Sequence, residues 1–262
     1  MQPLRKGRLI ARLAQSSHDL ARAQALRWRS FRAPAQGDAA TEGRDADAFD
    51  ARCMHLMVEE AAPGGALLAC CRLLPLADGG AIATSYAAQF YDLARLANYP
   101  GPLLEVGRFC IRPGDPDTDT LRLAWGALTR LVDTRGVAML FGASSFSGTD
   151  ATPHLPAFTH LAAHHLAPAR WMPAPKAPDV LRFAIAPRAV RATPMPPQIP
   201  PQIPPLLRSY LAMGGWVSDH AVVDRELNTL HVFTGVEIAA IPPDRARLLR
   251  ALAAEAPARI PA

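Results

Sequence analysis

The middle of the chain is predicted to alternate strand, helix and strand, and this order limits the possible folds more than any other feature of the sequence. Residues 120–134 place apolar side chains at helical spacing, and Gly136 follows as a helix-ending residue. The segments 103–111 (LLEVGRFCI) and 137–142 (VAMLFG) on either side are short, apolar and bounded by glycine or proline. Such an alternation is typical of a sheet with helices packed on its faces.

Other segments extend the same plan. Two strands are predicted at 53–59 and 66–74, and the turn residues between them favour an antiparallel hairpin. A first helix is expected from Ser16, whose capping-box partner is Asp19, to about Phe31. Further helices are expected at 86–96, 155–166, 206–213 and from Pro243 onward, and further strands at 180–186 and 230–236. The sequence therefore predicts an α/β (α+β) fold with a central sheet of mixed strand direction.

The chain is expected to form one main domain with a C-terminal extension. Its 262 residues, 50% of them hydrophobic, are sufficient for one substantial core. Residues 194–205 (PMPPQIPPQIPP) hold too many prolines for a helix or a sheet and predict an extended connector. The expected division is a core of residues 1–193, this connector, and an extension of residues 206–262 that packs on the core. The polar segment 33–48 predicts a loop that could close over a site.

Composition limits the partners and the compartment. The formal charge of +5 comes mostly from scattered arginines, which suit an acidic protein partner or an anionic membrane face rather than nucleic acid. The N-terminus lacks the apolar core of a signal peptide, and no stretch approaches the roughly 20 apolar residues that span a bilayer. The four cysteines have no C-x-x-C spacing and are expected as buried, reduced thiols. We therefore predict a cytoplasmic protein, with peripheral contact at the inner membrane left open.

The strand at 103–111 carries two charged residues, Glu105 and Arg108, in an otherwise apolar segment. An unpaired buried charge is costly. The two would face opposite sides of a regular strand, but Gly107 between them is a common position for a β-bulge that re-aims one of them. One interpretation is a structural ion pair or an edge strand with one wet face. The other is a partly desolvated carboxylate at a cleft, suited to accept a proton from an amine.

Arginines also interrupt other apolar elements. Arg27 lies among apolar neighbours on one face of the first predicted helix, and Arg72 lies inside the second strand of the hairpin. Together with Arg108, they indicate a concave polar site. In such a site, guanidinium groups order carboxylates of the protein or of the substrate through paired hydrogen bonds.

Three other clusters give weaker signals. His160, His164 and His165 lack the H-E-x-x-H pattern, so a packed or solvated helix face is favoured over a metal site. The charged group at 219–225 favours a capping or ion-pair network over catalysis. The serines at 144–147 lack the G-x-S-x-G context of a nucleophile, and the usual glycine-rich nucleotide motifs do not occur in the chain. Neither a metal site nor a bound cofactor is predicted.

An ordered set of motifs resembles the ornithine N-α-acyltransferases, which make lyso-ornithine lipid. The most specific motif is LEVGR at 104–108, and the set covers most of the chain from about residue 20 to residue 235. The resemblance implies the acetyltransferase-like (GNAT) fold, and the first half of the family is also similar to acyl-homoserine-lactone synthases. The other matching segments are 49–50, 53–58, 69–74, 85–93 (SYAAQFYDL), 140–150 (LFGASSFSGTD), 165–168 and 204–233.

The resemblance also implies which residues line the site. Phe90, Ser144 and Ser145 lie in two of the matching motifs and are expected to contact substrate. A strand-end backbone N–H within 142–145 is expected to donate to the developing oxyanion. The family pattern is an arginine and an aromatic residue on the first helix, an aspartate after it, a strand arginine and a Glu-x-x-Arg strand, which here correspond to Arg27, Phe31, Asp50, Arg72, Glu105 and Arg108.

The implied reaction moves a 3-hydroxyacyl or related group from the phosphopantetheine of acyl carrier protein to the α-amine of ornithine. Glu105, directly or through water, would deprotonate the amine, which then attacks the thioester carbonyl without a covalent enzyme intermediate. Glu105 and Arg108 are the predicted catalytic residues. Carrier protein and ornithine are the predicted partners, and no cofactor is bound by the enzyme itself.

Two departures from the family pattern bear on the substrates. Met54 stands where the family usually has an aspartate, which weakens any assignment of the ornithine side-chain amine to this position. Residues 112–120 (RPGDPDTDT) lack the glycine-rich loop that binds the coenzyme A pyrophosphate and carry three aspartates, which favours carrier protein as the donor. The alternatives are an acyltransferase for another amine, of the acyl-homoserine-lactone type or specific for another amino acid, and a non-catalytic acyl-carrier or lipid-binding module.

Overall fold

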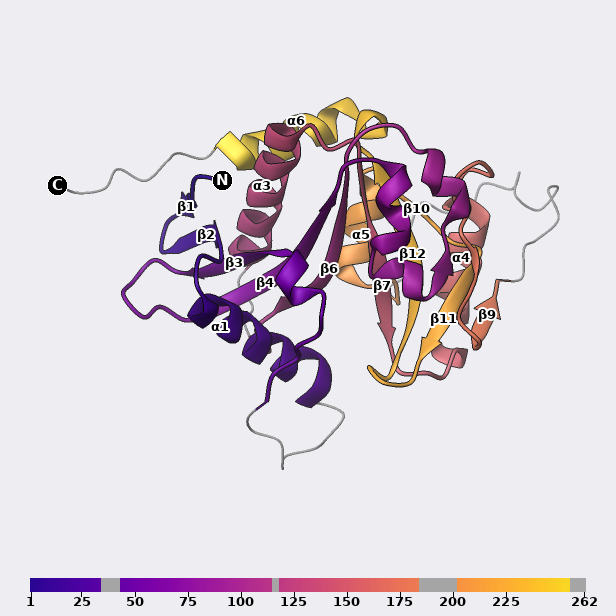
Figure 1. The fold of residues 1–262 in the computed structure, drawn as a ribbon, viewed down its shortest axis with the longest axis horizontal. Helices are drawn as coiled ribbons and strands as arrows, with labels where there is room; N and C mark the ends of the chain where they lie inside the picture. The colour runs from indigo at the N-terminus through magenta and orange to yellow at the C-terminus, as the bar shows by residue number, and fades with distance from the viewer. Residues whose placement is uncertain (34–42, 115–117, 184–201, 255–262) are drawn as a thin grey trace. The chain divides into compact units, whose positions relative to one another are not determined.

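The computed structural model describes residues 1–33, 43–114, 118–183 and 202–254 (Figure 1). Part of the predicted loop and most of the predicted connector lie outside these ranges, so the predicted division into core, connector and extension stays a prediction. The chain forms two compact units, each assembled from separate stretches of sequence. Unit 1 comprises residues 1–75, 106–137 and 243–262, and unit 2 comprises residues 76–105 and 138–242.

The sheet of unit 1 has the strand order β1-β2-β3-β4-β6, in which β1 to β4 pair antiparallel. The predicted hairpin of β3 and β4 is confirmed. β1 and β2 were not expected, because lysine and arginine side chains interrupt their apolar pattern. β6 begins in unit 2 and continues into unit 1 from Val106. The strand bounds are β1 Leu4–Lys6, β2 Leu9–Leu13, β3 Met54–Glu60, β4 Leu67–Leu76 and β6 Leu103–Ile111.

Among the described residues, unit 1 also contains the α-helices α1 (Ser17–Arg27), α3 (Thr118–Arg135) and α6 (Pro243–Ala254). The predicted cap of α1 is confirmed, since the Ser16 hydroxyl accepts the Asp19 N–H at 3.1 Å. A π-helix, η1 (Trp28–Arg32), continues from α1. α3 and α6 lie side by side (Figure 1), and Gly126 permits this approach because a Cβ there would come within 2.8 Å of a carbonyl oxygen of α6.

The sheet of unit 2 has the strand order β6-β7-β12-β11-β9, and β10 also pairs with β12. β6 and β7 are parallel over three residue pairs that end at Glu105 and Phe141, whereas β12 pairs antiparallel with β7, β10 and β11, and β11 pairs antiparallel with β9. The predicted mixed strand direction is thereby confirmed. The bounds are β7 Met139–Ser147, β9 Val180–Arg182, β10 Trp216–Val217, β11 His220–Asp224 and β12 Thr229–Glu237, with a separate pair formed by β5 Tyr91–Asp92 and β8 Ala174–Pro175.

Two predictions for unit 2 are wrong in detail. The segment 86–96 is not one helix, because Tyr91 and Asp92 pair with β8 and divide it. It holds the short 3₁₀ turns η4 (Ala87–Gln89) and η5 (Ala94–Asn98), preceded by η3 (Gly79–Thr84). Residues 143–147, expected as a loop, continue strand β7, because β12 pairs with β7 along its whole length.

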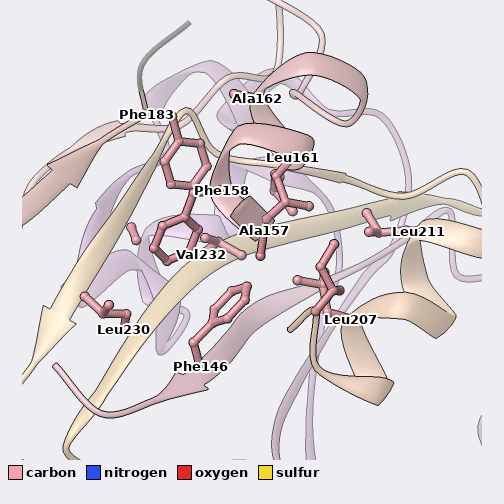
Figure 2. Packing of buried hydrophobic residues seen from close by; sticks show 13 residues of the cluster. Phe146, Ala157, Phe158, Leu161, Ala162, Phe183, Leu207, Leu211, Leu230 and Val232 are labelled. Atoms are coloured by element: carbon pink, nitrogen blue, oxygen red, sulfur yellow. The ribbon is translucent and has the colours of Figure 1, made fainter. Parts of the chain in front are cut away.

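The apolar core of unit 2 lies where α4 (Leu155–His164) and α5 (Pro205–Ala212) cover β7, β11 and β12 (Figure 2). The Phe146 and Phe158 rings are 4.9 Å apart, and Phe158 stacks on Phe183 at 5.0 Å. Among the described helices of both units, none has the length and apolar character required to cross a membrane. The labelled core residues are Phe146, Ala157, Phe158, Leu161, Ala162, Phe183, Leu207, Leu211, Leu230 and Val232.

Candidate active site

In unit 1, the predicted site arginines converge on aspartates of the segment 45–50. Arg27 on α1 holds Asp50 through two parallel bonds, Nη1 to Oδ1 and Nη2 to Oδ2, both 2.8 Å long. Its Nε also donates to Asp45 Oδ2 at 3.1 Å. Arg27 is only 1% exposed, so these charges interact away from water. In such a setting, well-aligned paired hydrogen bonds are needed to offset the cost of burying the charges.

Arg72 and Arg108 reach the same aspartates from the neighbouring strands β4 and β6. Arg72 Nη1 lies 2.5 Å from Asp47 Oδ1 and 3.3 Å from Asp50 Oδ1. Arg108 Nε donates to Asp45 Oδ2 at 2.9 Å. We call these six side chains the arginine–aspartate cluster. It joins α1, β4 and β6 to one loop, and its members are Arg27, Arg72, Arg108, Asp45, Asp47 and Asp50.

The guanidinium groups keep the buried aspartates ionised. Burial acts to raise the pKa of Asp50, but hydrogen bonds from Arg27 and Gln24 outweigh it and hold this pKa below its usual range. Burial also acts to raise the pKa of Asp45, and here the charge of Arg108 and a hydrogen bond from Arg32 lower it on balance. Asp45, Asp47 and Asp50, which these arginines bind, are carboxylates of the protein itself.

Arg108 interrupts the regular geometry of β6. Its φ of +52° lies in the left-handed region, which costs a residue with a Cβ about 1–2 kcal/mol. The backbone irregularity that the sequence suggested at Gly107 therefore occurs one residue later. Such a conformation persists only where surrounding contacts hold it. The bond from Arg108 to Asp45 is one such contact.

Phe31 has a different environment from the cluster. It lies in η1 and packs against the apolar group that includes Ala23, Leu26 and Cys70. Asp45 and Asp47 were not singled out from the sequence. The only signal for them was the acidic composition of the predicted loop at 33–48.

In unit 2, Glu105 is held by the backbone of a tight turn. Its Oε2 accepts the Tyr86 N–H at 2.8 Å, and its Oε1 accepts the Ala87 N–H at 2.7 Å. These amides stand at the start of η4, where N–H groups have no partner within the helix. Glu105 is 4% exposed. The two bonds fix the plane of its carboxylate and stabilise its negative charge.

The other predicted residues of unit 2 lie near this turn or on β7. The Phe90 ring ends the turn and contacts the rings of Tyr86, at 5.4 Å, and His231, at 5.1 Å. Ser144 is buried and its hydroxyl accepts a bond from Thr234 at 3.0 Å, whereas Ser145 is exposed.

The expected strand-end location of the oxyanion donor is wrong, because residues 142–145 lie inside β7, opposite residues 231–234 of β12. In an antiparallel ladder only alternate N–H groups point to the partner strand, so the others point to the opposite edge of β7.

The three histidines of α4 and its C-terminus form a ring cluster, with centroids 4.9 Å apart for His160 and His164 and 5.4 Å apart for His160 and His165. Within the described ranges, no group of three or more histidine, cysteine, aspartate or glutamate side chains could hold a metal ion. Burial lowers the pKa of His165 to about 4, and the pKa of His160 is lowered for the same reason.

This burial predicts a pH dependence of stability. Between pH 4 and about 6.5 the folded state binds fewer protons at His165 than the unfolded state, so the unfolding free energy should rise with pH across this window. Urea unfolding at several pH values should show a shallower rise for His165→Gln than for wild type. The exposed His18 on α1 supplies the control, and an equal slope in His165→Gln and His18→Gln would contradict the prediction.

Comparison with known proteins identifies the family. The family model described as "Acetyltransferase (GNAT) domain" matches residues 26–126, which include Arg27, Asp50, Arg72, Glu105 and Arg108. The L-ornithine N(alpha)-acyltransferase of Rhodobacter capsulatus is 30% identical over 232 residues, covering 84% of this chain and 86% of the relative. The enzyme of the same name from Brucella abortus is 30% identical over 246 residues, covering 87% and 84%.

Among solved structures, an N-acyl amino acid synthase from uncultured soil microbes aligns with a TM-score of 0.49 at 10% identity, covering 89% of this chain and 94% of that one. The family match and the mixed sheet flanked by helices confirm the expected GNAT fold. With 30% identity over most of both chains, this protein is an N-acyltransferase that belongs to the L-ornithine N(alpha)-acyltransferase family.

Proposed function

We propose that this enzyme transfers a 3-hydroxyacyl or related fatty acyl group from acyl carrier protein to the α-amine of ornithine, which gives lyso-ornithine lipid. The names of the relatives support ornithine as the acceptor. The observation that carries the proposed chemistry is the carboxylate of Glu105, which two backbone amides hold in one orientation.

Glu105 is the general base of this proposal. Because its side chain is 4% exposed, we route the proton from the ornithine ammonium to the carboxylate through one bridging water. The free amine then attacks the thioester carbonyl, so that a C–N bond forms and the C–S bond breaks. The pantetheine thiol leaves with a proton, and no covalent enzyme intermediate forms.

The arginine–aspartate cluster has a supporting role in this proposal. Its guanidinium groups bind aspartates of the chain itself, so we assign Arg27, Arg72 and Asp50 to fixing the loop 45–50 on α1 and β4. Arg108, predicted as catalytic, holds Asp45 in the same way. Phe31, Phe90, Ser144 and Ser145 stay predicted substrate contacts.

Carrier protein is the proposed donor because three aspartates follow β6, at positions 115, 117 and 119. A cluster of negative charge there would repel the diphosphate of free coenzyme A. Under this proposal phosphopantetheine arrives attached to the carrier, and the enzyme binds no cofactor of its own. We place the reaction in the cytoplasm, where the carrier protein receives its acyl group.

The test offers two donors and several acceptors. The enzyme is incubated with 3-hydroxyacyl carrier protein or with the same acyl group on coenzyme A, and with ornithine, lysine or glutamine, and the products are identified by mass spectrometry. We expect N-acyl-ornithine, formed faster from the carrier. Faster transfer from coenzyme A would overturn the donor, and preferential acylation of lysine or glutamine would overturn the acceptor. Absence of transfer from either donor would favour a binding module.

A further inference from the structure

We propose that Ser85 is a positioning residue for Glu105. Its hydroxyl fixes the start of the turn formed by residues 85–90, which we call the Glu105 turn, and thereby aims the two amides that hold the carboxylate. This inference rests on the proposed role of Glu105 as the base, and it assigns to Ser85 a function in the reaction.

Three consecutive amides at the start of the Glu105 turn need acceptors. Those of Tyr86 and Ala87 donate to Glu105, and that of Ala88 donates to the Ser85 hydroxyl at 3.2 Å. A serine that accepts the N–H three residues later is the usual N-terminal cap of a helical turn. Ser85 is 2% exposed, so its hydroxyl is shielded from water.

Loss of the Ser85 hydroxyl would change which backbone amides donate hydrogen bonds to Glu105. The Ala88 amide would lose its acceptor in a buried setting, since Ala88 is 7% exposed. A buried N–H without a partner is costly. A shift of the turn that brings the Ala88 N–H toward the carboxylate, at the expense of the Tyr86 or Ala87 bond, would relieve this cost. The carboxylate plane would rotate with that shift.

The far end of the Glu105 turn is anchored independently of Ser85. Lys176 Nζ donates to the Ala88 carbonyl at 2.6 Å, and the Ala177 N–H donates to the Phe90 carbonyl at 2.9 Å. The Phe90 ring also lies edge-on to His231. Removal of the Ser85 hydroxyl should therefore re-aim the first amides of the turn without unfolding it, which separates positioning from general stability.

The test compares three variants with wild type. Ser85→Ala removes the cap, and Ser85→Thr keeps a hydroxyl. The control, Thr84→Ala, removes a neighbouring exposed hydroxyl that donates to the Ala81 carbonyl. We expect kcat for ornithine acylation to fall on the order of tenfold in Ser85→Ala, with KM for both substrates nearly unchanged. Ser85→Thr should recover most of the rate, and Thr84→Ala should match wild type.

The pH–rate profile distinguishes positioning from a purely structural role. Weaker amide bonds stabilise the carboxylate charge less, so the acidic limb of kcat in Ser85→Ala should move to higher pH. A purely structural role would lower the melting temperature and leave kcat per folded enzyme and this limb in place, which would overturn the inference. If Ser85→Ala does not fold, Ser85→Gly removes the same hydroxyl with a residue that caps tolerate.

Glu105→Gln, assayed in parallel, separates the two proposals. An active Glu105→Gln enzyme would overturn both the base and the positioning role. An inactive Glu105→Gln enzyme together with a Ser85→Ala enzyme of wild-type kcat and pH profile would overturn the positioning role alone.

Discussion

Replacement of Glu105 by glutamine should reduce acyl transfer to ornithine by about 10²- to 10⁴-fold, the usual contribution of a general base. Glutamine has nearly the same shape, so its carbonyl oxygen can still accept one of the two amide N–H bonds. Its NH₂ group, however, is a donor and would face the second backbone N–H, which is also a donor, so no hydrogen bond can form between them. The variant should thus keep the fold, lose one bond to the turn, and lack a group that accepts the ammonium proton.

Mass spectrometry of N-acyl-ornithine gives the rate, and titration with holo carrier protein gives the affinity, which should stay near that of wild type. Glu237→Gln is the matched control, because Glu237 is a partly buried acid of the same unit at the end of β12 that contacts Tyr99 and Arg170. Retention of more than about a tenth of the wild-type rate by Glu105→Gln would remove the base from the mechanism.

Arg27→Leu should lower the free energy of unfolding by about 3–5 kcal/mol, the range measured when one partner of a buried ion pair is removed. The leucine would leave the Asp50 carboxylate, 6% exposed, without the two paired N–H donors of Arg27. Asp45 would lose the hydrogen bond that it accepts from Arg27 Nε. Urea unfolding followed by circular dichroism measures the change. Arg8→Leu is the control, because the Arg8–Glu60 bridge at 2.9 Å is 62% and 37% exposed and should contribute less than about 1 kcal/mol.

The double variant Arg27→Leu with Asp50→Asn tests the cause of that loss. Neutralising the stranded carboxylate should recover part of the stability, so the two changes together should cost less than their separate effects added. Additive losses would indicate that Arg27 acts through packing of its stem. A loss below about 1 kcal/mol in Arg27→Leu alone would show that the ion pair is hydrated in solution.

The parts of the fold that follow from local chemistry were predictable. The Ser16 cap, the helical period of α3 and the turn between β3 and β4 all depend on residues close together in the sequence. The extension of β7 to Ser147 was not, because the small polar residues there favour a loop until β12 pairs with them. The same holds for residues 86–96, where pairing with β8 outweighs helix propensity.

The candidate site shows the same limit. Arg27, Arg72 and Arg108 were noticeable because each is a charge within an apolar element, and their carboxylate partners were expected in kind. Asp45 and Asp47 were missed individually, since a loop aspartate has no pattern of its own. The amides that hold Glu105 could not be foreseen, because every residue except proline carries one.

The discontinuity of both units matters while the protein is being made. β7 leaves the ribosome roughly 80 residues before β12, the strand that pairs with all nine of its residues. At typical translation rates that interval is on the order of ten seconds, during which one edge of β7 lacks its partner strand. α3 likewise precedes α6, its neighbour in unit 1, by more than 100 residues. In nascent chains of this enzyme, the edge of β7 that pairs with β12 therefore stays open until β12 has been synthesised.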